Sequence, residues 1–435
     1  VRSRLSAQKV FADPEVTAAY NKQIKDFVDA QANVEEKYET AETKARDVEV
    51  LFHLMEDWRP QLILAGGPRA IPMALPTANF LKIPLLCLTL QMMRPCSSIK
   101  PVGLPDSIPR FLYYPLWRLV CMLIKNQEMK RTLPVLTKAT GLTKAQLNLS
   151  TTEFMRYYSA KPTFLSINAY SPAIHGEPPA EFNSNNVAIG ALMPSVQQQN
   201  TSMFGSEEMA SLQDFLAAGD APVYLGFGSI VCGTSKFMTL LCLRAMKLTG
   251  ERCVLVRGWS QMCVEDVKDE PDEDELRAFC AEKVLFLSKA PHGWLFPRCK
   301  VVVHHGGAGT LNASCLAGRP TIILAIVADQ PDHADLVNEQ GFGVGFRKMK
   351  DMKPEELARA IQKCISTSSI QQKAKEVAEK LAKEDGPGKL VEMVKDYMES
   401  HVRTGRHMKQ AIQEKESRWC CATCLPRKTA HDTAY

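Results

Sequence analysis

Residues 301–310 read Val301-Val302-Val303-His304-His305-Gly306-Gly307-Ala308-Gly309-Thr310, and this stretch decides the fold. Its three valines form a short apolar run, typical of a buried strand, and the glycines after them predict a turn into a helix. Glycine lets the backbone approach a ligand closely. The start of a helix adds unpaired N–H groups and the positive end of its dipole. The pattern therefore predicts a phosphate site where a parallel strand ends.

The side chains of this stretch suit the same chemistry. The imidazoles of His304 and His305 can donate hydrogen bonds to a diphosphate oxygen, and Thr310 adds a hydroxyl at the helix start. The alternative is a tight turn whose histidines only satisfy loop carbonyls. The stretch matches neither a Walker loop nor the dinucleotide fingerprint. A second turn, Gly226-Phe227-Gly228-Ser229, also ends a strand and could supply further donors to the same phosphates.

Outward from this stretch, short apolar runs alternate with helical patterns, which predicts the α/β class with parallel sheets. A first unit begins with an apolar run after Pro60, a helix from Ile71 and a strand at 85–90. Two further short strands are expected at 164–167 and 187–189. A second unit contains the strands expected at 223–226, 253–256, 284–287, 301–304 and 321–325, with helices at 236–248, 310–317, 354–383 and 390–403.

The polar, aperiodic stretch at 197–202 predicts a linker between the two units. The expected boundaries are a first domain at 1–195, a linker at 196–210, a second domain at 211–400 and a tail at 401–435. Charged residues with helical periodicity at 13–55 predict one or two amphipathic helices. Cys420, Cys421 and Cys424 lie in the tail, for which disorder is expected, with a lipidated or zinc-binding segment as the alternative.

Composition excludes several classes of function. The chain has 435 residues, a net charge of +5 and 45% hydrophobic residues, which is ordinary globular usage and predicts no nucleic-acid partner. The 14 cysteines are scattered through apolar stretches, which favours a reducing, cytoplasmic compartment. The longest apolar stretch, 111–124, is interrupted by Pro115 and Arg118. We therefore expect a soluble chain, at most peripheral to a membrane. Because the chain begins with Val1, a signal peptide can be neither asserted nor denied.

Several motifs resemble one known signature. The segments 290–298, 304–310 and 317–321, followed by Asp329-Gln330-Pro331, resemble the nucleotide-sugar signature of the sterol 3-beta-glucosyltransferases. These enzymes are members of the UDP-glycosyltransferase superfamily, which has the GT-B fold. The turn Gly226-Phe227-Gly228-Ser229 also matches that family. The resemblance is specific over 222–345 and weaker over 58–105.

The resemblance implies two Rossmann-like domains facing a cleft, with the acceptor in the first and the UDP-sugar in the second. It implies transfer of glucose from UDP-glucose to a sterol or related lipid, with inversion and without metal or cofactor. The residues that match the family's donor site are Ser229, His304, His305, Gly307, Gly309 and Thr310 for the diphosphate, Asp329 and Gln330 for the sugar, and Leu287, Ser288, Pro291 and His292 for the uracil and ribose.

The chain also departs from the family pattern. Aromatic residues usually follow the Asp-Gln pair, whereas Pro331-Asp332-His333 follow here. Nothing before Trp58 matches the family's opening unit, so we expect an incomplete first domain and a general base upstream of Val1. The stretch at 111–124 is expected either to line a lipid-sized pocket or to form a core helix.

Two alternatives to sterol glucosylation stay open. One is transfer to another small hydrophobic acceptor, and the other is a non-catalytic module that binds a nucleotide sugar or a lipid. The segment Asp272-Glu273-Asp274 has the Asp-x-Asp spacing of metal-dependent glycosyltransferases of another fold. Because it lies in the acidic run 266–275, we expect a solvated loop there and no metal.

Overall fold

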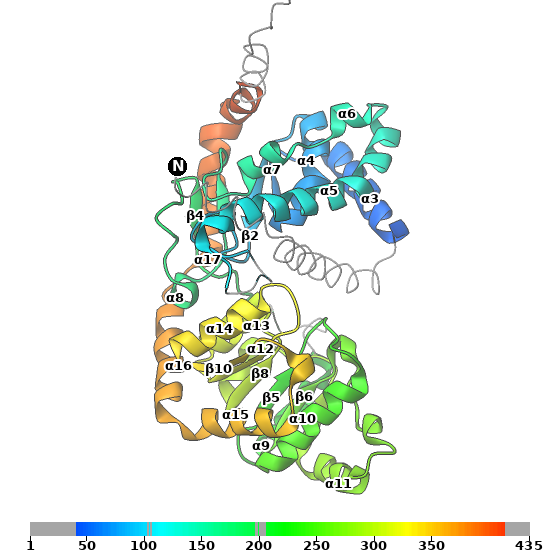
Figure 1. The fold of residues 1–435 in the computed structure, drawn as a ribbon, viewed down its shortest axis with the longest axis vertical. Coiled ribbons are helices and arrows are strands. Elements are labelled where there is room, and N and C mark those ends of the chain that lie inside the picture. Colours follow the sequence, from blue (N-terminus) through cyan, green and yellow to red (C-terminus); the bar gives the residue numbers. More distant parts are fainter. Residues whose placement is uncertain (1–40, 102–103, 105–106, 196–198, 200–205, 414–435) are drawn as a thin grey trace, which may run out of the picture.

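The chain folds into two α/β units, each built on its own parallel sheet (Figure 1). A computed structural model describes residues 41–101, 104, 107–195, 199 and 206–413. The predicted helices before residue 41 and the cysteines of the predicted tail lie outside these residues. Within the described part of the chain, no helix is both long and apolar enough to cross a membrane.

The first sheet, which defines the N-terminal unit, has the strand order β1-β2-β3-β4 and is parallel throughout. Its central strands β2 and β3 are largely buried, and α4 packs against β1 and β2. The elements of this unit are α3 (Ala41–Trp58), β1 (Ile63–Gly66), α4 (Gly67–Leu81), β2 (Leu85–Thr89), α5 (Tyr113–Thr140), α6 (Lys144–Leu147), α7 (Thr151–Tyr157), β3 (Ser166–Asn168), α8 (Pro172–His175) and β4 (Asn186–Ala188).

The second sheet, which defines the C-terminal unit, has the order β10-β9-β8-β5-β6-β7, and all its neighbours are parallel. The chain therefore crosses over between β7 and β8, where the strand order changes direction. Its elements are α9 (Met209–Ala217), β5 (Val223–Gly226), α10 (Ser235–Thr249), β6 (Cys253–Val256), α11 (Glu273–Lys283), β7 (Val284–Leu287), α12 (His292–Leu295), β8 (Val301–His304), α13 (Ala308–Leu316), β9 (Thr321–Leu324), α14 (Gln330–Gln340), β10 (Gly343–Phe346), α15 (Pro354–Ser366), α16 (Ser368–Leu381) and α17 (Gly386–Tyr397).

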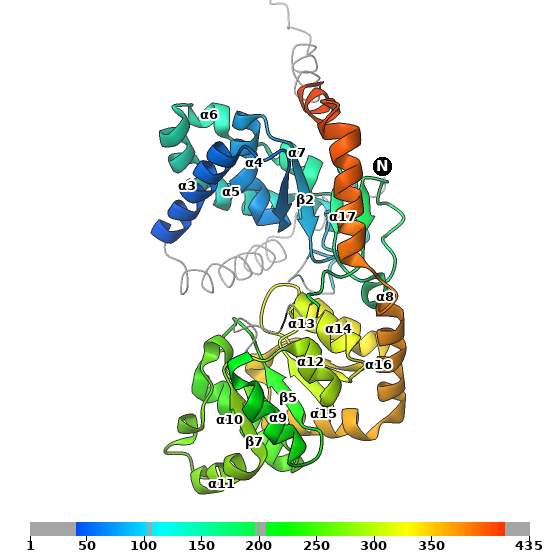
Figure 2. The same ribbon diagram turned by 180° about the vertical axis from the view of Figure 1, so that it is seen from behind.

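Two helices connect the units. Helix α17 returns along the N-terminal unit in both views (Figures 1 and 2), and Leu390, Met393 and Val394 pack on the residues of the first sheet. Helix α8 is part of the N-terminal unit, yet its Ile174 is fully buried in a cluster with residues of α13, α14 and α16. Glu384 contacts the start of α8. Its Oε1 accepts hydrogen bonds from Ser171 Oγ (2.8 Å) and from the Ala173 backbone N–H (3.1 Å).

The α/β class is confirmed, and the strands expected at 223–226, 253–256, 284–287 and 301–304 have those bounds in the structure. Several elements differ from expectation. Strand β10 and helix α14 were not predicted. The helical segment expected at 354–383 is two helices, α15 and α16, separated by Thr367. The domain boundaries remain a prediction; α17, which falls within the expected second domain, lies against the first sheet.

Candidate functional site

The turn between β8 and α13 forms the centre of the site. Strand β8 ends at His304, and Gly307 is the residue directly before α13. Because Gly307 has no side chain, it leaves the first backbone N–H groups of that helix uncapped. Gly306 has φ +90°, and a Cβ at this position would lie 2.7 Å from Ile323 Cγ2. Only glycine fits this turn without strain, so the sequence places uncapped N–H groups at the carboxyl end of the sheet.

His304 shapes this turn from within the protein. Its side chain is fully buried, and its Nδ1 accepts a hydrogen bond from the Gly306 backbone N–H at 2.9 Å. Its Nε2 finds no hydrogen-bond partner in the described structure. Burial and the neighbouring histidines lower the pKa of His304 well below its usual value, so the ring is neutral. Because Nδ1 accepts, the neutral ring carries its hydrogen on Nε2, and the contact of His304 with a diphosphate stays a prediction.

His305 lies where the two glycine turns meet. A Cβ on Gly307 would lie 2.4 Å from His305 Nε2, and a Cβ on Gly228 would lie 3.2 Å from His305 Cε1. The structure thus brings together two turns that are far apart in the sequence. Burial lowers the pKa of His305 to about 4, although the charge of Asp329 opposes the shift. The neutral ring can donate one hydrogen bond to an anion.

The other residues expected at the diphosphate lie in the turn after β5 and in the first turn of α13. Ser229 is exposed in the turn after β5, and Gly309 and Thr310 lie in the first turn of α13, where Gly309 is exposed and Thr310 is half-buried. Figures 1 and 2 show α12, α13 and α14 on the side of the C-terminal unit that faces the N-terminal unit. The predicted diphosphate residues therefore share one edge of the sheet, next to the other unit.

The residues expected at the sugar lie in the next loop of the sheet. Asp329 is 6% exposed, and its Oδ2 has no hydrogen-bond partner among the described residues. The amide oxygen of Gln330 instead accepts hydrogen bonds from the backbone N–H groups of Ile326 (2.9 Å) and Val327 (3.0 Å). Asp329 was expected at the end of a strand; it directly precedes α14, after a loop that contains Ala328 at φ +57°.

His333 was not predicted as part of the site. Its Nδ1 lies 2.7 Å from the Gly306 carbonyl oxygen, and its Nε2 lies 3.7 Å from Asp329 Oδ2. The signal that could have found it is its spacing: His333 is four residues after Asp329, so a helix starting at Gln330 places both on one face.

The region expected to hold uracil and ribose contains a further residue that was missed. Glu208 accepts hydrogen bonds from the Ser288 backbone N–H (2.9 Å) and from Ser288 Oγ. Leu287 is buried in the core, and Pro291 precedes α12. His292 lies 3.1 Å from Tyr224 OH through its Nε2 and stacks on Phe296. The sequence offers no local signal for Glu208, which precedes Ser288 by 80 residues.

The acidic run 266–275 is more structured than expected. Arg244 donates hydrogen bonds to Asp272 (2.6 and 2.9 Å) and to Glu270 (2.8 Å), and α11 begins at Glu273. The segment is exposed in part, as a solvated loop would be, but it also contains an ion pair and the first residues of a helix.

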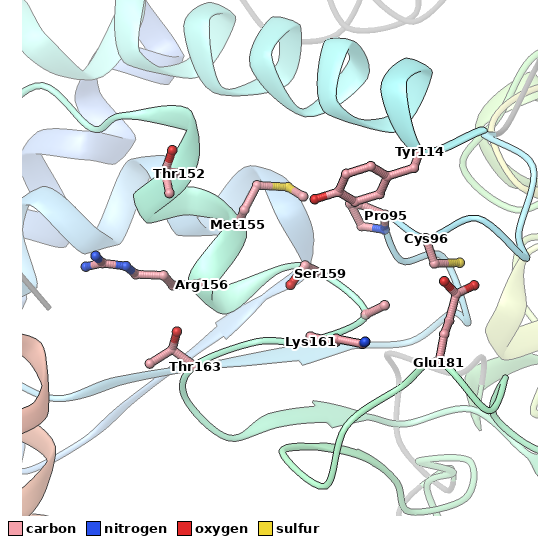
Figure 3. Close-up of a pocket in the computed structure, with 11 residues that line it drawn as sticks. Pro95, Cys96, Tyr114, Thr152, Met155, Arg156, Ser159, Lys161, Thr163 and Glu181 are labelled. Carbon is pink, nitrogen blue, oxygen red and sulfur yellow. The ribbon is translucent and has the colours of Figure 1, made fainter. Parts of the chain in front are cut away.

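The N-terminal unit contains a cavity of about 400 Å³ (Figure 3). Tyr114, which lies in the stretch 111–124, lines it together with Met155, Ser159, Lys161 and Glu181. Burial alone would raise the pKa of Glu181, but hydrogen bonds from Ser98 and Ser97 lower it to about 2. The rest of 111–124 starts the long helix α5, whose Trp117 and Cys121 are buried. The cavity is therefore partly polar and charged at neutral pH.

Comparison with solved structures defines the class of fold. The chain is similar to the glycosyltransferase of kitacinnamycin (TM-score 0.52, 16% identity, covering 82% of each chain). It is also similar to the spinosyn forosaminyltransferase SpnP (TM-score 0.52, 14% identity, covering 81% of this chain and 80% of that one). At these identities the likeness shows the fold alone. The chain has the GT-B fold.

Sequence comparison adds one matching family and two similar proteins. Residues 267–397 match the family described as erythromycin biosynthesis protein CIII-like, C-terminal domain. The chain is 31% identical over 214 residues to a sterol 3-beta-glucosyltransferase of Saccharomyces cerevisiae, covering 47% of this chain and 17% of the relative. It is 34% identical over 180 residues to a sterol 3-beta-glucosyltransferase of Arabidopsis thaliana, covering 41% of this chain and 26% of the relative. The chain thus matches about a quarter or less of these relatives' length.

Proposed function

We propose that the chain binds a UDP-sugar and transfers its hexose, glucose from UDP-glucose, to the hydroxyl of a sterol or related lipid with inversion. The observation that carries the proposal is the place of His305. Its neutral ring lies between Gly228 and Gly307, beside the uncapped first turn of α13, where a diphosphate would meet several donors at once. The similarity to sterol 3-beta-glucosyltransferases supports the choice of sugar and acceptor.

The residues of the site would assist departure of the diphosphate. The acceptor oxygen attacks the anomeric carbon, the bond from that carbon to the diphosphate oxygen breaks, and the diphosphate takes the electron pair. The N–H groups at the start of α13 and the His305 ring then donate to the oxygens on which charge develops. The proton of the acceptor hydroxyl must pass to a base. We assign no described residue to that role.

A second candidate acceptor is favoured by the cavity of the N-terminal unit. Lys161 and the ionised Glu181 line it, as do Ser159 and Tyr114. Such a lining suits a small hydrophobic acceptor with polar substituents better than an entirely apolar one. This reading keeps the same transfer chemistry and the same donor site. Contact with a membrane surface belongs to the sterol version, because a sterol acceptor resides in a membrane.

Titration calorimetry with UDP tests the donor site. We expect His305→Ala to weaken UDP binding about tenfold, because a donor to a charged oxygen is lost. His53→Ala serves as the control, since that ring is exposed on α3. Unchanged UDP affinity in His305→Ala would contradict the phosphate assignment.

Release of UDP from UDP-glucose, with a sterol or a flavonoid-like acceptor, then tests transfer. Release with the sterol supports the leading proposal, and release only with the smaller acceptor supports the second. UDP binding without release in the presence of either acceptor would instead indicate a non-catalytic module that binds nucleotide sugars.

A further inference from the structure

His333 and Asp329 present two hydrogen-bond acceptors to each other at the edge of the donor site. His333 Nδ1 lies 2.7 Å from the carbonyl oxygen of Gly306. A carbonyl oxygen only accepts, so Nδ1 must carry the hydrogen and the lone pair of a neutral ring must be on Nε2. That Nε2 lies 3.7 Å from Asp329 Oδ2, which is itself an acceptor. An imidazole lone pair and a carboxylate oxygen have no hydrogen to share with each other.

Both acceptors are buried. Asp329 is 6% exposed and His333 is 4% exposed, and Asp329 Oδ2 lacks a hydrogen-bond partner in the described part of the chain. A buried carboxylate oxygen without a donor is costly, so such an atom points to a ligand that supplies one. The pair lies directly beside the turn at Gly306, which adjoins His305.

A third ring packs against this pair. The His175 ring of α8 lies 5.2 Å from the His333 ring, so residues of both units surround His333.

From this geometry we propose that His333 determines sugar specificity: its Nε2 and Asp329 Oδ2 accept hydrogen bonds from two adjacent hydroxyl groups of the donor sugar. Each of the two acceptor atoms then receives a hydrogen bond from a sugar hydroxyl group. The inference rests on the proposed function, and it names the feature that the sugar must have: neighbouring free hydroxyl groups at the position facing α14. His333 Nδ1 meanwhile holds the Gly306 carbonyl and so keeps the diphosphate turn in place.

Two substitutions separate the proposed contact of His333 with the sugar from its contact with the Gly306 carbonyl. In His333→Asn the shorter amide can still donate to the Gly306 carbonyl but has no acceptor at the position of Nε2. We expect affinity for UDP-glucose to fall about tenfold more than affinity for UDP, the loss typical of one hydrogen bond to a sugar hydroxyl. In His333→Gln an amide oxygen reaches the position of Nε2, so UDP-glucose affinity should partly recover. His53→Asn is the control, because its exposed ring lies on α3.

UDP-glucose analogues that lack one hydroxyl identify the group involved. The analogues are the 2-, 3-, 4- and 6-deoxy forms of the sugar. We expect the one that lacks the hydroxyl bound by His333 to have the same affinity for wild-type and His333→Asn protein. For the other analogues, the affinities of the two proteins should still differ about tenfold. Nitrogen-15 NMR of the complex with UDP-glucose at pH 7.5 should show hydrogen on Nδ1 of His333 only.

Three results would overturn the inference: equal losses of UDP and UDP-glucose affinity in His333→Asn, the same ratio for every analogue, or hydrogen on both ring nitrogens. The last would indicate a buried ion pair with Asp329. Wild-type protein that binds neither UDP nor UDP-glucose would overturn the proposed function instead, so the two failures are distinguishable. Melting temperatures of both variants within a few degrees of wild type show that the losses are not due to unfolding.

Discussion

At the scale of single residues, the site depends on how closely His305 is enclosed. The space that a side chain at Gly307 would need is already occupied by the Nε2 atom of His305. Gly307 itself has φ −62° and ψ 141°, a backbone conformation open to any residue. Its role is therefore to leave room for the ring.

Gly307→Ala tests this role without straining the backbone. We expect the added methyl group, 2.4 Å from His305 Nε2, to displace the ring and weaken UDP binding about tenfold. Titration calorimetry measures the change. Gly66→Ala is the matched control, since a methyl group there meets no atom within 4 Å and the backbone is also extended. Wild-type affinity in Gly307→Ala would contradict the tight enclosure of the ring.

The two histidines of the motif also show how far residue-level prediction from sequence extends. The spacing of His304 and His305 after a strand was enough to place both at the carboxyl end of a sheet. It could not assign them different roles, because side chains alternate between opposite faces at a strand end. His304 points inward to Gly306, whereas His305 lies between the two glycine turns.

At the scale of elements, α14 packs on β10 with almost no intervening side chain. A Cβ on Gly345 would lie 1.9 Å from the Ala334 carbonyl oxygen, and one on Gly343 would lie 2.9 Å from Val337 Cγ1, both in α14. These glycines let the helix that carries His333 approach the sheet. Strand β10 was not predicted, because alternating glycines weaken the apolar signal of a strand.

Gly345→Ala should therefore destabilise the protein and disturb sugar binding through α14. We expect the free energy of unfolding to fall by about 1–3 kcal/mol, the usual cost of overpacking. Urea unfolding followed by circular dichroism measures it. Leu248→Ala on α10 is the control, because Leu248 is 54% exposed and its loss should change stability by less than about 0.5 kcal/mol. Equal stability of the two variants would show that α14 can move away freely.

At the scale of the whole molecule, buried histidines link the donor site to the packing of the two units. His175 comes from the N-terminal unit and faces His333 of the C-terminal unit, with ring centroids 5.2 Å apart. Burial lowers the pKa values of His292 and His305 to about 4 and that of His175 to about 3. All three rings are neutral in the folded protein at pH 7.

This burial predicts a loss of stability in acid. The unfolded chain takes up protons on these histidines near pH 6.5, whereas the folded chain takes them up only near pH 3–4. Stability is therefore complete above about pH 6.5 and falls as the pH drops toward 4, by up to about 2 kcal/mol for each buried ring at pH 5. Urea unfolding at pH 7.5 and pH 5.0 measures the difference.

His305→Asn removes one of these rings and should reduce the pH dependence, while His53→Asn should leave it intact because that ring is exposed. The same free energy of unfolding at both pH values would contradict the prediction that the buried rings stay neutral.

The sequence alone was sufficient to predict the α/β class, four strands of the second sheet and the glycine turn after β8. These features depend on local signals, namely apolar runs of strand length and the glycines that end them. Only the tertiary structure placed His305 between Gly228 and Gly307, bonded His333 to Gly306, and laid α17 on the first sheet. The physical reason is sequence distance: each of these arrangements joins segments whose contact arises from packing of the sheets and helices, and no short window of sequence contains both partners.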